Sequence, residues 1–339
     1  MSKTMEQTVD HMMGFFKTKT ITAALDLKIF DYFNDQAQTV ESLATKSLLP
    51  PAALERLLIA LVAMEYLKKD GENYILPQEH KDFLVSDKPQ WLGWLGRHID
   101  TFLYPLWSNL SSGIQQDSHQ RVAAFGDNRS WFDMLYHNLD DVADFQEFLG
   151  KFAQPFIDGF TSEYDFSKHK RFLDIGSGIG TLPIAVADKF TDIELAICEL
   201  PQAKSFLLDK LGEQGYGNRI DVIEGNVITG ELPDIEYDLV HLGWMLHDYS
   251  HETQMVILNN IFQAMPVGGR FIASETPLND DNTGPEFTSL LSLNMLVSTD
   301  GGIESDIKTY IKRFEDAGFS NVRILDIPGP RTLFVGEKI

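Results

Sequence analysis

The residues best suited to chemistry in this sequence surround a glycine-rich stretch, 171–180, which reads RFLDIGSGIG. Residues 172–175 predict a buried strand, residues 182–190 predict a helix, and the turn between them carries Gly176, Gly178 and Gly180. A strand–turn–helix unit of this kind directs backbone N–H groups and a helix N-terminus at a nucleotide-like ligand. The alternative is a tight turn without a ligand. The G-x-G-x-G spacing differs from the G-x-G-x-x-G of dinucleotide sites and disfavours a nicotinamide oxidoreductase.

An acidic residue, Glu199, follows the next predicted strand, 193–198. It lies about 20 residues past the glycines, where folds of this type place a carboxylate on the ribose hydroxyls of a nucleotide. The alternative is a solvated carboxylate at the end of a strand.

Further polar and glycine-containing segments follow the other predicted strands. The carboxyl ends of parallel strands meet at one edge of a sheet, and ligands bind there. Together with the segment before the last predicted helix, those ends are residues 174–180, 199–200, 225–227, 243–249, 275–276 and 301–304. We therefore expect a single site along this edge.

The composition disfavours several classes of function. The formal net charge is −22, and nucleic acid and acidic membrane surfaces both need neutralising Lys and Arg, so neither is an expected partner. The lone cysteine, Cys198, lies in a predicted apolar strand; no disulfide can form within the chain, and a cytoplasmic location is expected. Residues 1–13 lack the apolar core of a secretion signal, and the longest apolar run, near 57–64, is too short to span a bilayer.

The first part of the chain predicts a small helical domain. Thr39 is a candidate N-cap for a short helix, and Pro50-Pro51 opens another. Asp70-Gly71, between two apolar runs, predicts a hairpin turn. Helix, helix and hairpin form a winged-helix pattern, which is common in DNA-binding modules. The candidate recognition helix carries Arg56 as its only base, so packing or dimerisation is favoured over DNA binding.

Residues 101–165 predict helices rich in aromatic side chains. Aromatic residues at helical spacing usually form a core. So many of them beside a ligand-binding domain also suit the walls of an apolar pocket, and Trp131, Phe145 and Leu149 are our candidates for that role.

From Tyr164 onward, predicted strands and helices alternate, which indicates a mostly parallel sheet with helices on both faces. The predicted strands are 171–175, 193–198, 220–224, 237–242 and 269–275. The predicted helices are 180–190, 201–213, 251–265 and 306–318. Two last apolar segments predict a terminal antiparallel pair, 322–327 with 332–335.

These segments, in this order, resemble those of the S-adenosylmethionine (SAM)-dependent O-methyltransferases. That family includes plant caffeate and flavonoid methyltransferases, hydroxyindole methyltransferases and many bacterial natural-product enzymes. The resemblance covers nearly the whole chain. It rests on D-x-G-x-G-x-G from Asp174 to Gly180, on His247-Asp248-Tyr249 followed by Glu275 and Glu304, and on the segments 24–27, 83–87, 164–167, 242–249, 274–276 and 301–304.

The resemblance implies an α/β fold. Residues 166–339 would form a Rossmann-like class I methyltransferase domain, with a mostly parallel sheet and a terminal antiparallel hairpin. Residues 1–100 would form a mostly helical winged-helix dimerisation domain, and residues 101–165 a helical connector that lines the acceptor pocket. The resemblance also implies a homodimer in which this N-terminal domain contributes to the partner's pocket.

The resemblance further implies that His247 is the catalytic base and that Glu275 and Glu304 are its flanking carboxylates. A carboxylate on the far ring nitrogen fixes the tautomer and stabilises the imidazolium. SAM would be the cofactor, with S-adenosylhomocysteine (SAH) as its product, bound by Asp174, Gly176, Gly178, Gly180, Glu199, Leu200, Asn226, Val227 and Gly243. The acceptor would contact Trp131, Phe145, Leu149, Trp244, Asp248, Asn294 and Met295. No metal is expected.

Two positions depart from the pattern of the plant members. Asn226 stands where they have Asp; it can still accept a hydrogen bond from the adenine amino group but carries no charge. Gly243 stands where they have a Lys near SAM. Both changes predict weaker donor binding and leave the chemistry in place.

Other functions stay open. A protein of the same family could methylate carbon or nitrogen, or bind SAM and catalyse a reaction without methyl transfer. The winged helix could belong to a DNA-binding regulator. His247 and His251 are four residues apart, but HDYSH lacks the glutamate of H-E-x-x-H, so a metal site is disfavoured. The expected acceptor is a small aromatic or polyketide-like hydroxyl compound of secondary metabolism, and the sequence does not identify it.

Overall fold

The computed structural model describes residues 2–33, 36–135, 139–232, 236–329 and 331–339, with the backbone alone for 139–145 and 147–148. Its internal contacts divide the chain into two compact units, residues 1–104 and 105–339. The proposed connector over 101–165 therefore stays a prediction. No helix among the described residues is both long enough and apolar enough to cross a bilayer. The cytoplasmic location also stays a prediction.

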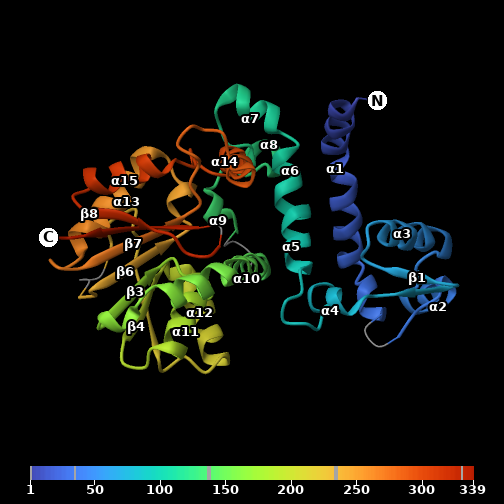
Figure 1. The fold of residues 1–339 in the computed structure, drawn as a ribbon, viewed down its shortest axis with the longest axis horizontal. Coiled ribbons are helices and arrows are strands. Elements are labelled where there is room, and N and C mark those ends of the chain that lie inside the picture. The colour runs from blue at the N-terminus through green and yellow to red at the C-terminus, as the bar shows by residue number, and fades with distance from the viewer. Residues whose placement is uncertain (1, 34–35, 136–138, 233–235, 330) are drawn as a thin grey trace. The chain divides into compact units, whose positions relative to one another are not determined.

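The first unit is mostly helical with a small hairpin (Figure 1). Its elements are α1 Lys3–Asp26, η1 Ile29–Phe33, α2 Val40–Ser47, α3 Pro51–Ala63, β1 Lys68–Asp70, β2 Asn73–Ile75, α4 Gln78–Leu84, α5 Gly93–His98 and η2 Ile99–Leu103. Thr39 caps α2 by accepting the N–H of Ser42 at 3.2 Å, as predicted. Pro51 is the first residue of α3. Asp70 pairs with Asn73, so the hairpin turn is Gly71-Glu72, one residue later than predicted.

Helix α1 buries few of its side chains within this unit. Its buried residues, Thr22, Ala24 and Leu25, all lie near its C-terminal end. The preceding turns expose large apolar side chains, namely Met5, Val9, Met12, Met13, Phe15 and Phe16. Contiguous exposed apolar surface of this kind marks an interaction site more often than a free surface.

The second unit begins with short helices and continues as an alternating α/β domain. Its helices are α6 Tyr104–Trp107, α7 Leu110–Gln116, α8 Arg121–Phe125, α9 Trp131–Leu135, α10 Leu139–Glu163, η3 Phe166–Lys168, α11 Thr181–Lys189, α12 Pro201–Glu213, η4 Leu246–Asp248, α13 His251–Ala264, α14 Glu286–Ser298 and α15 Ile307–Asp316. Its strands are β3 Arg171–Ile175, β4 Glu194–Glu199, β5 Ile220–Glu224, β6 Leu239–Gly243, β7 Arg270–Glu275, β8 Ser320–Leu325 and β9 Thr332–Glu337.

Within the described residues these strands form a seven-stranded sheet in the order β5-β4-β3-β6-β7-β9-β8. The pairs from β5 to β7 are parallel, and β9 is antiparallel to both β7 and β8. The predicted mostly parallel sheet with a terminal antiparallel pair is confirmed. The strand order reverses between β3 and β6, and the crevice at such a point is where α/β sheets bind ligands.

Helices cover both faces of the sheet, with α13 and α15 on one side and α11 and α12 on the other (Figure 1). Alternate residues of each strand supply the two cores: Phe172 packs among residues of α10, α11 and α12. Leu173 packs among residues of α13 and α15. The predicted strands and helices of this region are confirmed to within two residues at each end.

Helix α14 was not predicted by the sequence pattern. Its apolar side chains are distributed around the helix and do not form a single stripe, so it lacks the periodicity that identifies a surface helix. It carries Asn294 and Met295, two of the predicted acceptor contacts.

Candidate active site

The glycine turn lies between β3 and α11, as predicted. Gly176, Gly178 and Gly180 have φ values of 66°, 63° and 79°, a region that side chains disfavour. A Cβ on Gly176 would overlap the end of the Met245 side chain, and one on Gly178 would overlap the amide oxygen of Gln146. The backbone conformation therefore favours glycine at all three positions, and at 176 and 178 a side chain would also have to displace the flexible ends of Met245 and Gln146.

Glu199 ends β4 with its side chain buried. Its Oε2 has no hydrogen-bond partner among the described residues. Burial raises the pKa of Glu199 to about 7, and the N–H groups of Leu200 and Gly178 oppose that effect. A buried carboxylate oxygen without a partner is costly, so this atom is suited to accept a hydrogen bond from a ligand hydroxyl.

Asp174 belongs to a buried hydrogen-bond network that the sequence did not reveal. One carboxylate oxygen contacts His241 Nδ1 at 2.6 Å, and the other accepts the hydroxyl of Ser177 at 2.5 Å. His241 Nε2 contacts the hydroxyl of Ser274 at 3.0 Å. The network joins β3, β6 and β7 beneath the glycine turn. Both oxygens of Asp174 thus have protein partners, which indicates that this carboxylate shapes the turn.

The same network accounts for Gly243, at the end of β6. A Cβ at this position would lie 2.7 Å from His241 Cε1 and 3.1 Å from Ser274 Oγ. His241 therefore occupies the room that a side chain at 243 would need. The sequence signal for His241 was weak, because a lone histidine in an apolar strand is most often a core residue.

Three other predicted cofactor residues lie at the ends of β4 and β5. Asn226 Oδ1 accepts the backbone N–H groups of Ile228 at 2.9 Å and Thr229 at 3.4 Å, which stabilises the turn after β5. Val227 is buried in that turn, and the half-buried Leu200 precedes α12. The oxygen of Asn226 already has two donors, so its predicted contact with adenine stays a prediction.

His247 lies in η4, after β6, and is buried between carboxylates. Its Nδ1 contacts Glu304 Oε1 at 2.5 Å. Its Nε2 lies 3.7 Å from Asp248 Oδ1. The charge of Glu275, the other predicted flanking carboxylate, also acts on His247, and Glu275 Oε1 accepts the N–H groups of Met245 at 3.1 Å and Leu246 at 2.9 Å. Glu275 thereby holds the backbone of the turn that carries the histidine.

The electrostatics of this cluster favour protonated His247 in the absence of ligand. Burial alone would lower the pKa of His247, but the negative charges of Glu304 and Asp248 outweigh it and raise the pKa to about 10. Burial raises the pKa of Asp248 to about 6 and that of Glu275 to about 7. Each of these shifts limits the number of like charges in the buried cluster.

Trp244 separates the histidine from an aromatic group on α10. Its ring stacks on His247 with centroids 5.3 Å apart and on Phe152 with centroids 5.2 Å apart. Its Nε1 donates to Thr276 Oγ1 at 3.3 Å. The backbone of Trp244 has φ 52°, which costs on the order of 1–3 kcal/mol in a non-glycine residue. Strain of this size at a ring beside the histidine indicates that the ring position serves function.

The remaining predicted acceptor contacts lie in three helices. Trp131 is buried in α9, and Leu149 is half-buried in α10. The side chain of Phe145 lies outside the described part of the chain. In α14, Met295 is buried, and Asn294 Oδ1 accepts the indole N–H of Trp107 at 2.8 Å.

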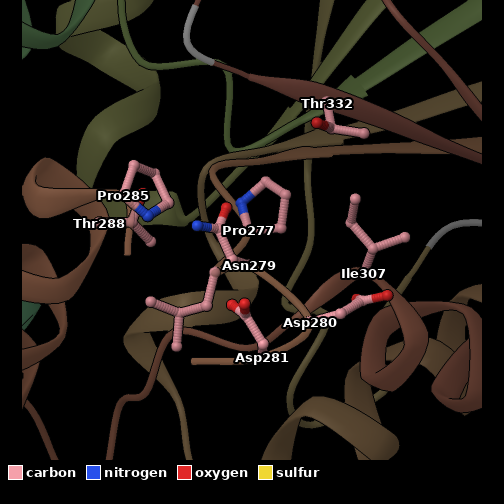
Figure 2. Close-up of a pocket in the computed structure, with 9 residues that line it drawn as sticks. Pro277, Asn279, Asp280, Asp281, Pro285, Thr288, Ile307 and Thr332 are labelled. Carbon is pink, nitrogen blue, oxygen red and sulfur yellow. The ribbon is translucent and has the colours of Figure 1, made fainter. Parts of the chain in front are cut away.

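An open cleft of about 630 Å³ lies past the end of β7. Figure 2 shows it lined by residues of the loop after β7, by the start of α14 and α15, and by Thr332, and none of the predicted site residues lines it. Its two carboxylates already have partners, since Asp280 pairs with Lys308 at 3.0 Å and Asp281 accepts the hydroxyl of Thr283 at 2.6 Å. Both carboxylates of the cleft therefore already accept hydrogen bonds from the protein.

His251, the possible metal-binding partner of His247, has another contact: its Nδ1 accepts the Nε–H of Arg313 at 2.9 Å. The described residues contain no group of three or more His, Cys, Asp and Glu side chains arranged to hold a metal ion.

The sheet order, glycine turn and strand-end carboxylates are those of a Rossmann-like nucleotide-binding domain. Comparison with known proteins identifies it further: residues 107–320 match an O-methyltransferase domain, and residues 9–78 match an O-methyltransferase dimerisation domain. The chain belongs to the O-methyltransferase family, as the motifs predicted.

The relatives are similar along nearly their whole length. The S-adenosyl-L-methionine-dependent methyl transferase PigF of Serratia sp. is 65% identical over 338 residues, which span 100% of this chain and 97% of PigF. A solved structure of PigF with SAH has a TM-score of 0.96 at 64% identity and covers 100% of both chains. The tetracenomycin polyketide synthesis 8-O-methyl transferase TcmO of Streptomyces glaucescens is 24% identical over 96% of this chain and 94% of its own. The N,N-dimethyltransferase OxyT of Streptomyces rimosus is 24% identical over 90% of this chain and 88% of its own.

The buried network makes a stability prediction. In His241→Leu the Asp174 carboxylate loses one of its two partners, and a lost hydrogen bond to a buried charged group costs about 1.5–3 kcal/mol. We expect the free energy of unfolding, measured by urea titration, to fall by that amount. Asp174→Asn, which keeps a hydrogen-bonding side chain but removes the buried charge, should cost less. A His241→Leu protein within about 1 kcal/mol of wild type would contradict a stabilising role, since typical single hydrogen bonds contribute that much.

Proposed function

We propose that this protein transfers the methyl group of SAM to a hydroxyl oxygen of a small planar acceptor. The observation that carries the proposal is the buried contact between His247 Nδ1 and Glu304 at 2.5 Å. It leaves Nε2 as the ring nitrogen that can take a proton, beside the aromatic surface of Trp244. Histidine paired with a carboxylate is an arrangement by which proteins deprotonate hydroxyls.

The chain also fits the proposed cofactor. The unpartnered Oε2 of Glu199 suits a ribose hydroxyl, and the glycine turn leads into the N-terminus of α11, a position suited to a nucleotide-like ligand. PigF, which is similar to this chain along its whole length, is named as SAM-dependent and has been solved with SAH. When bound, SAM supplies an activated methyl group that needs no further activation by the protein.

The residues of the chain then divide the remaining tasks. His247 Nε2 takes the proton of the acceptor hydroxyl, and Glu304 orients the ring and stabilises its charge. Glu275 holds the backbone of residues 245 and 246 in place. Trp244 and Phe152 provide stacked aromatic surface for a flat acceptor. Alignment of this kind can supply about 7–11 kcal/mol of the barrier reduction.

Methylation of nitrogen is the second candidate, because the relative OxyT is named as an N,N-dimethyltransferase. An assay with labelled SAM and a panel of phenols, hydroxyquinones, indoles and aromatic amines separates the two. Mass spectrometry of the product should place the methyl group on oxygen. A methyl group found on nitrogen or carbon, or a panel without any methylated product, would contradict the proposal.

Donor binding makes the first prediction of this function. Glu199→Ala should raise the Kd for SAH, measured by titration calorimetry, by roughly tenfold or more, because a hydrogen bond to a charged group contributes about 1.5–3 kcal/mol. Since the pKa of Glu199 is raised to about 7, wild-type affinity should fall as the pH drops below 7 and the carboxyl takes a proton.

The matched control for Glu199 is Glu224, its register partner at the end of the neighbouring strand β5. Glu224 pairs with Lys204 at 3.0 Å and is exposed. Glu224→Ala should leave the Kd for SAH unchanged. An unchanged Kd in Glu199→Ala would remove Glu199 from the donor site.

The base makes the next prediction. His247→Ala should lower kcat by about 10²–10⁴ with little change in the Kd for SAH, for an acceptor whose own pKa lies well above 7. The raised pKa of His247 means that the neutral ring forms only at alkaline pH, so kcat/KM of wild type should rise with pH through a pKa above 6.5. Glu304→Gln removes the nearest negative charge, so this rise should shift to lower pH.

The control for the role of His247 is the expected shift of the pH profile in Glu304→Gln. A residue that only packs the site would change the rate without moving the pH profile. A His247→Ala enzyme of near-normal rate, or a Glu304→Gln profile that coincides with wild type, would show that another group takes the proton.

We further propose that the protein is a homodimer assembled through its first unit. Residues 9–78 match the dimerisation domain, and α1 exposes Met12 at 72% and Phe16 at 54% of their side-chain surface. Both are on the part of the helix that the unit does not cover. A self-complementary apolar surface of this kind is typical of symmetric dimers.

The dimer makes a direct prediction. Met12→Glu with Phe16→Glu should convert the dimer to a monomer in light scattering at micromolar concentration, because the charges would be buried unpaired in the interface. Leu208→Glu, which replaces a side chain of α12 exposed at 42%, should remain dimeric. A monomeric wild type would contradict the assembly.

A further inference from the structure

Arg331 is a buried cation at the edge of the candidate active site, and it was not among the predicted site residues. It precedes β9, whose Thr332 pairs with Glu275 at the end of β7. Its side chain is almost covered, with 8% of the residue exposed. Its Cζ lies 4.6 Å from the ring centroid of Trp244 and 4.8 Å from that of Phe156. The Trp244 ring that Arg331 contacts is the ring that stacks on His247.

Among the described residues, none accepts a hydrogen bond from the Arg331 guanidinium or forms a direct ion pair with it. The guanidinium lies over the two rings, and the negative charges of Glu275 and Asp174 act on it from further away. The other buried arginines of the described chain do have acceptors. Arg121 donates to the carbonyl oxygen of Ser298 at 2.6 Å. Arg313 donates to the hydroxyl of Ser305 at 2.8 Å. Arg331 therefore differs from Arg121 and Arg313 in having no hydrogen-bond acceptor among the described residues.

The guanidinium nitrogens of Arg331 are not among the side-chain atoms that are both fully buried and without a partner, so they reach open space. They carry five N–H donors in a fixed plane, and donors without protein acceptors in a mostly buried group are available to a ligand. Burial lowers the pKa of Arg331 to about 10, so the group still carries its charge at neutral pH. The aromatic contacts compensate in part through cation–π attraction but accept no hydrogen bond. A bound ligand with an electron-rich oxygen would supply the missing acceptor.

The strand order indicates whether this ligand is the methyl donor or the acceptor. Along the sheet edge, Glu199 ends β4, His247 follows β6, and Arg331 precedes β9, in the order β4-β3-β6-β7-β9. Arg331 thus lies on the opposite side of the base from the proposed ribose site. The acceptor, whose hydroxyl must reach His247, extends toward that side. Glu275 Oε2, at the intervening strand, is also buried without a partner among the described residues.

We propose that Arg331 determines acceptor specificity by binding an oxygen of the acceptor that carries full or partial negative charge, such as a carboxylate or a conjugated carbonyl. This inference rests on the proposed function, since it assumes an acceptor beside His247. The unpartnered Glu275 Oε2 would accept from a neighbouring hydroxyl of the same ligand. Acceptors with such an oxygen on a flat skeleton would be favoured over plain phenols.

The first test asks whether Arg331 is retained for binding at the expense of stability. Arg331→Met removes the charge and keeps the apolar stem, so the ligand-free variant should melt at the wild-type temperature or above it. Arg121→Met is the matched control, since it leaves Ser298 O and Asp300 without their donor and should melt lower. A clear drop in the melting temperature of Arg331→Met would show that the arginine is part of the fold and would overturn the proposal.

The second test uses benzoate and benzyl alcohol as probes, titrated calorimetrically into the complex of the protein with SAH. Wild type should bind benzoate about tenfold more tightly, as one charge-assisted hydrogen bond predicts. Arg331→Met should lose that preference, and Arg331→Lys should keep part of it. The Kd for SAH should stay within about twofold of wild type, because no hydrogen bond to the donor is removed. Equal binding of the two probes by wild type would overturn the proposal.

The outcomes also separate the two possible ligands. If Arg331→Met weakens SAH about tenfold, the missing acceptor is the carboxylate of the donor, and the acceptor assignment is wrong. If wild type does not bind SAH at all, the proposed function fails. The same two probes titrated into the ligand-free protein would then still show whether Arg331 binds an oxygen anion.

Discussion

The hydrogen bond between His247 and Glu304 is the interaction on which the rest of the site depends. It fixes which ring nitrogen is available and concentrates negative charge in a place that water does not reach. Glu304 comes from the segment before α15, far along the chain from η4, so this contact depends on the packing that brings the two segments together. The core on both faces of the sheet and the backbone contacts of Glu275 serve to hold these two segments together.

Much of the fold was predictable because its signals are local. Glycines at 176, 178 and 180, short apolar strands and the Thr39 cap each determine the local conformation around them. The strand ends then follow from the geometry of parallel sheets, which is why carboxylates widely separated in sequence could be expected at one edge. The sequence pattern did not predict helix α14, because its apolar residues do not form the single stripe that identifies a surface helix.

The residues that the sequence did not reveal act through contacts between distant segments. His241 stands alone in an apolar strand, and only the register of β3, β6 and β7 brings Asp174 and Ser274 to its two nitrogens. The missing side chain at Gly243 then follows from the space that His241 fills. Arg331 carries no motif, and its position over Trp244 depends on the antiparallel return of β9. Such residues can be recognised only once the pairing of strands is known.

The sign of the buried charges also changes along the ligand-binding edge of the sheet. The carboxylates of Glu199, Glu275 and Glu304 make the donor and base positions electronegative, which suits a ligand with a positive sulfonium. In the proposed complex with SAM, that positive charge would oppose protonation of His247 and lower its pKa from the value raised by Glu304, so donor binding would prepare the base. Arg331 carries a positive charge at the other end of the same edge. The proposed cationic donor and electron-rich acceptor would thus each lie on their own side of the histidine.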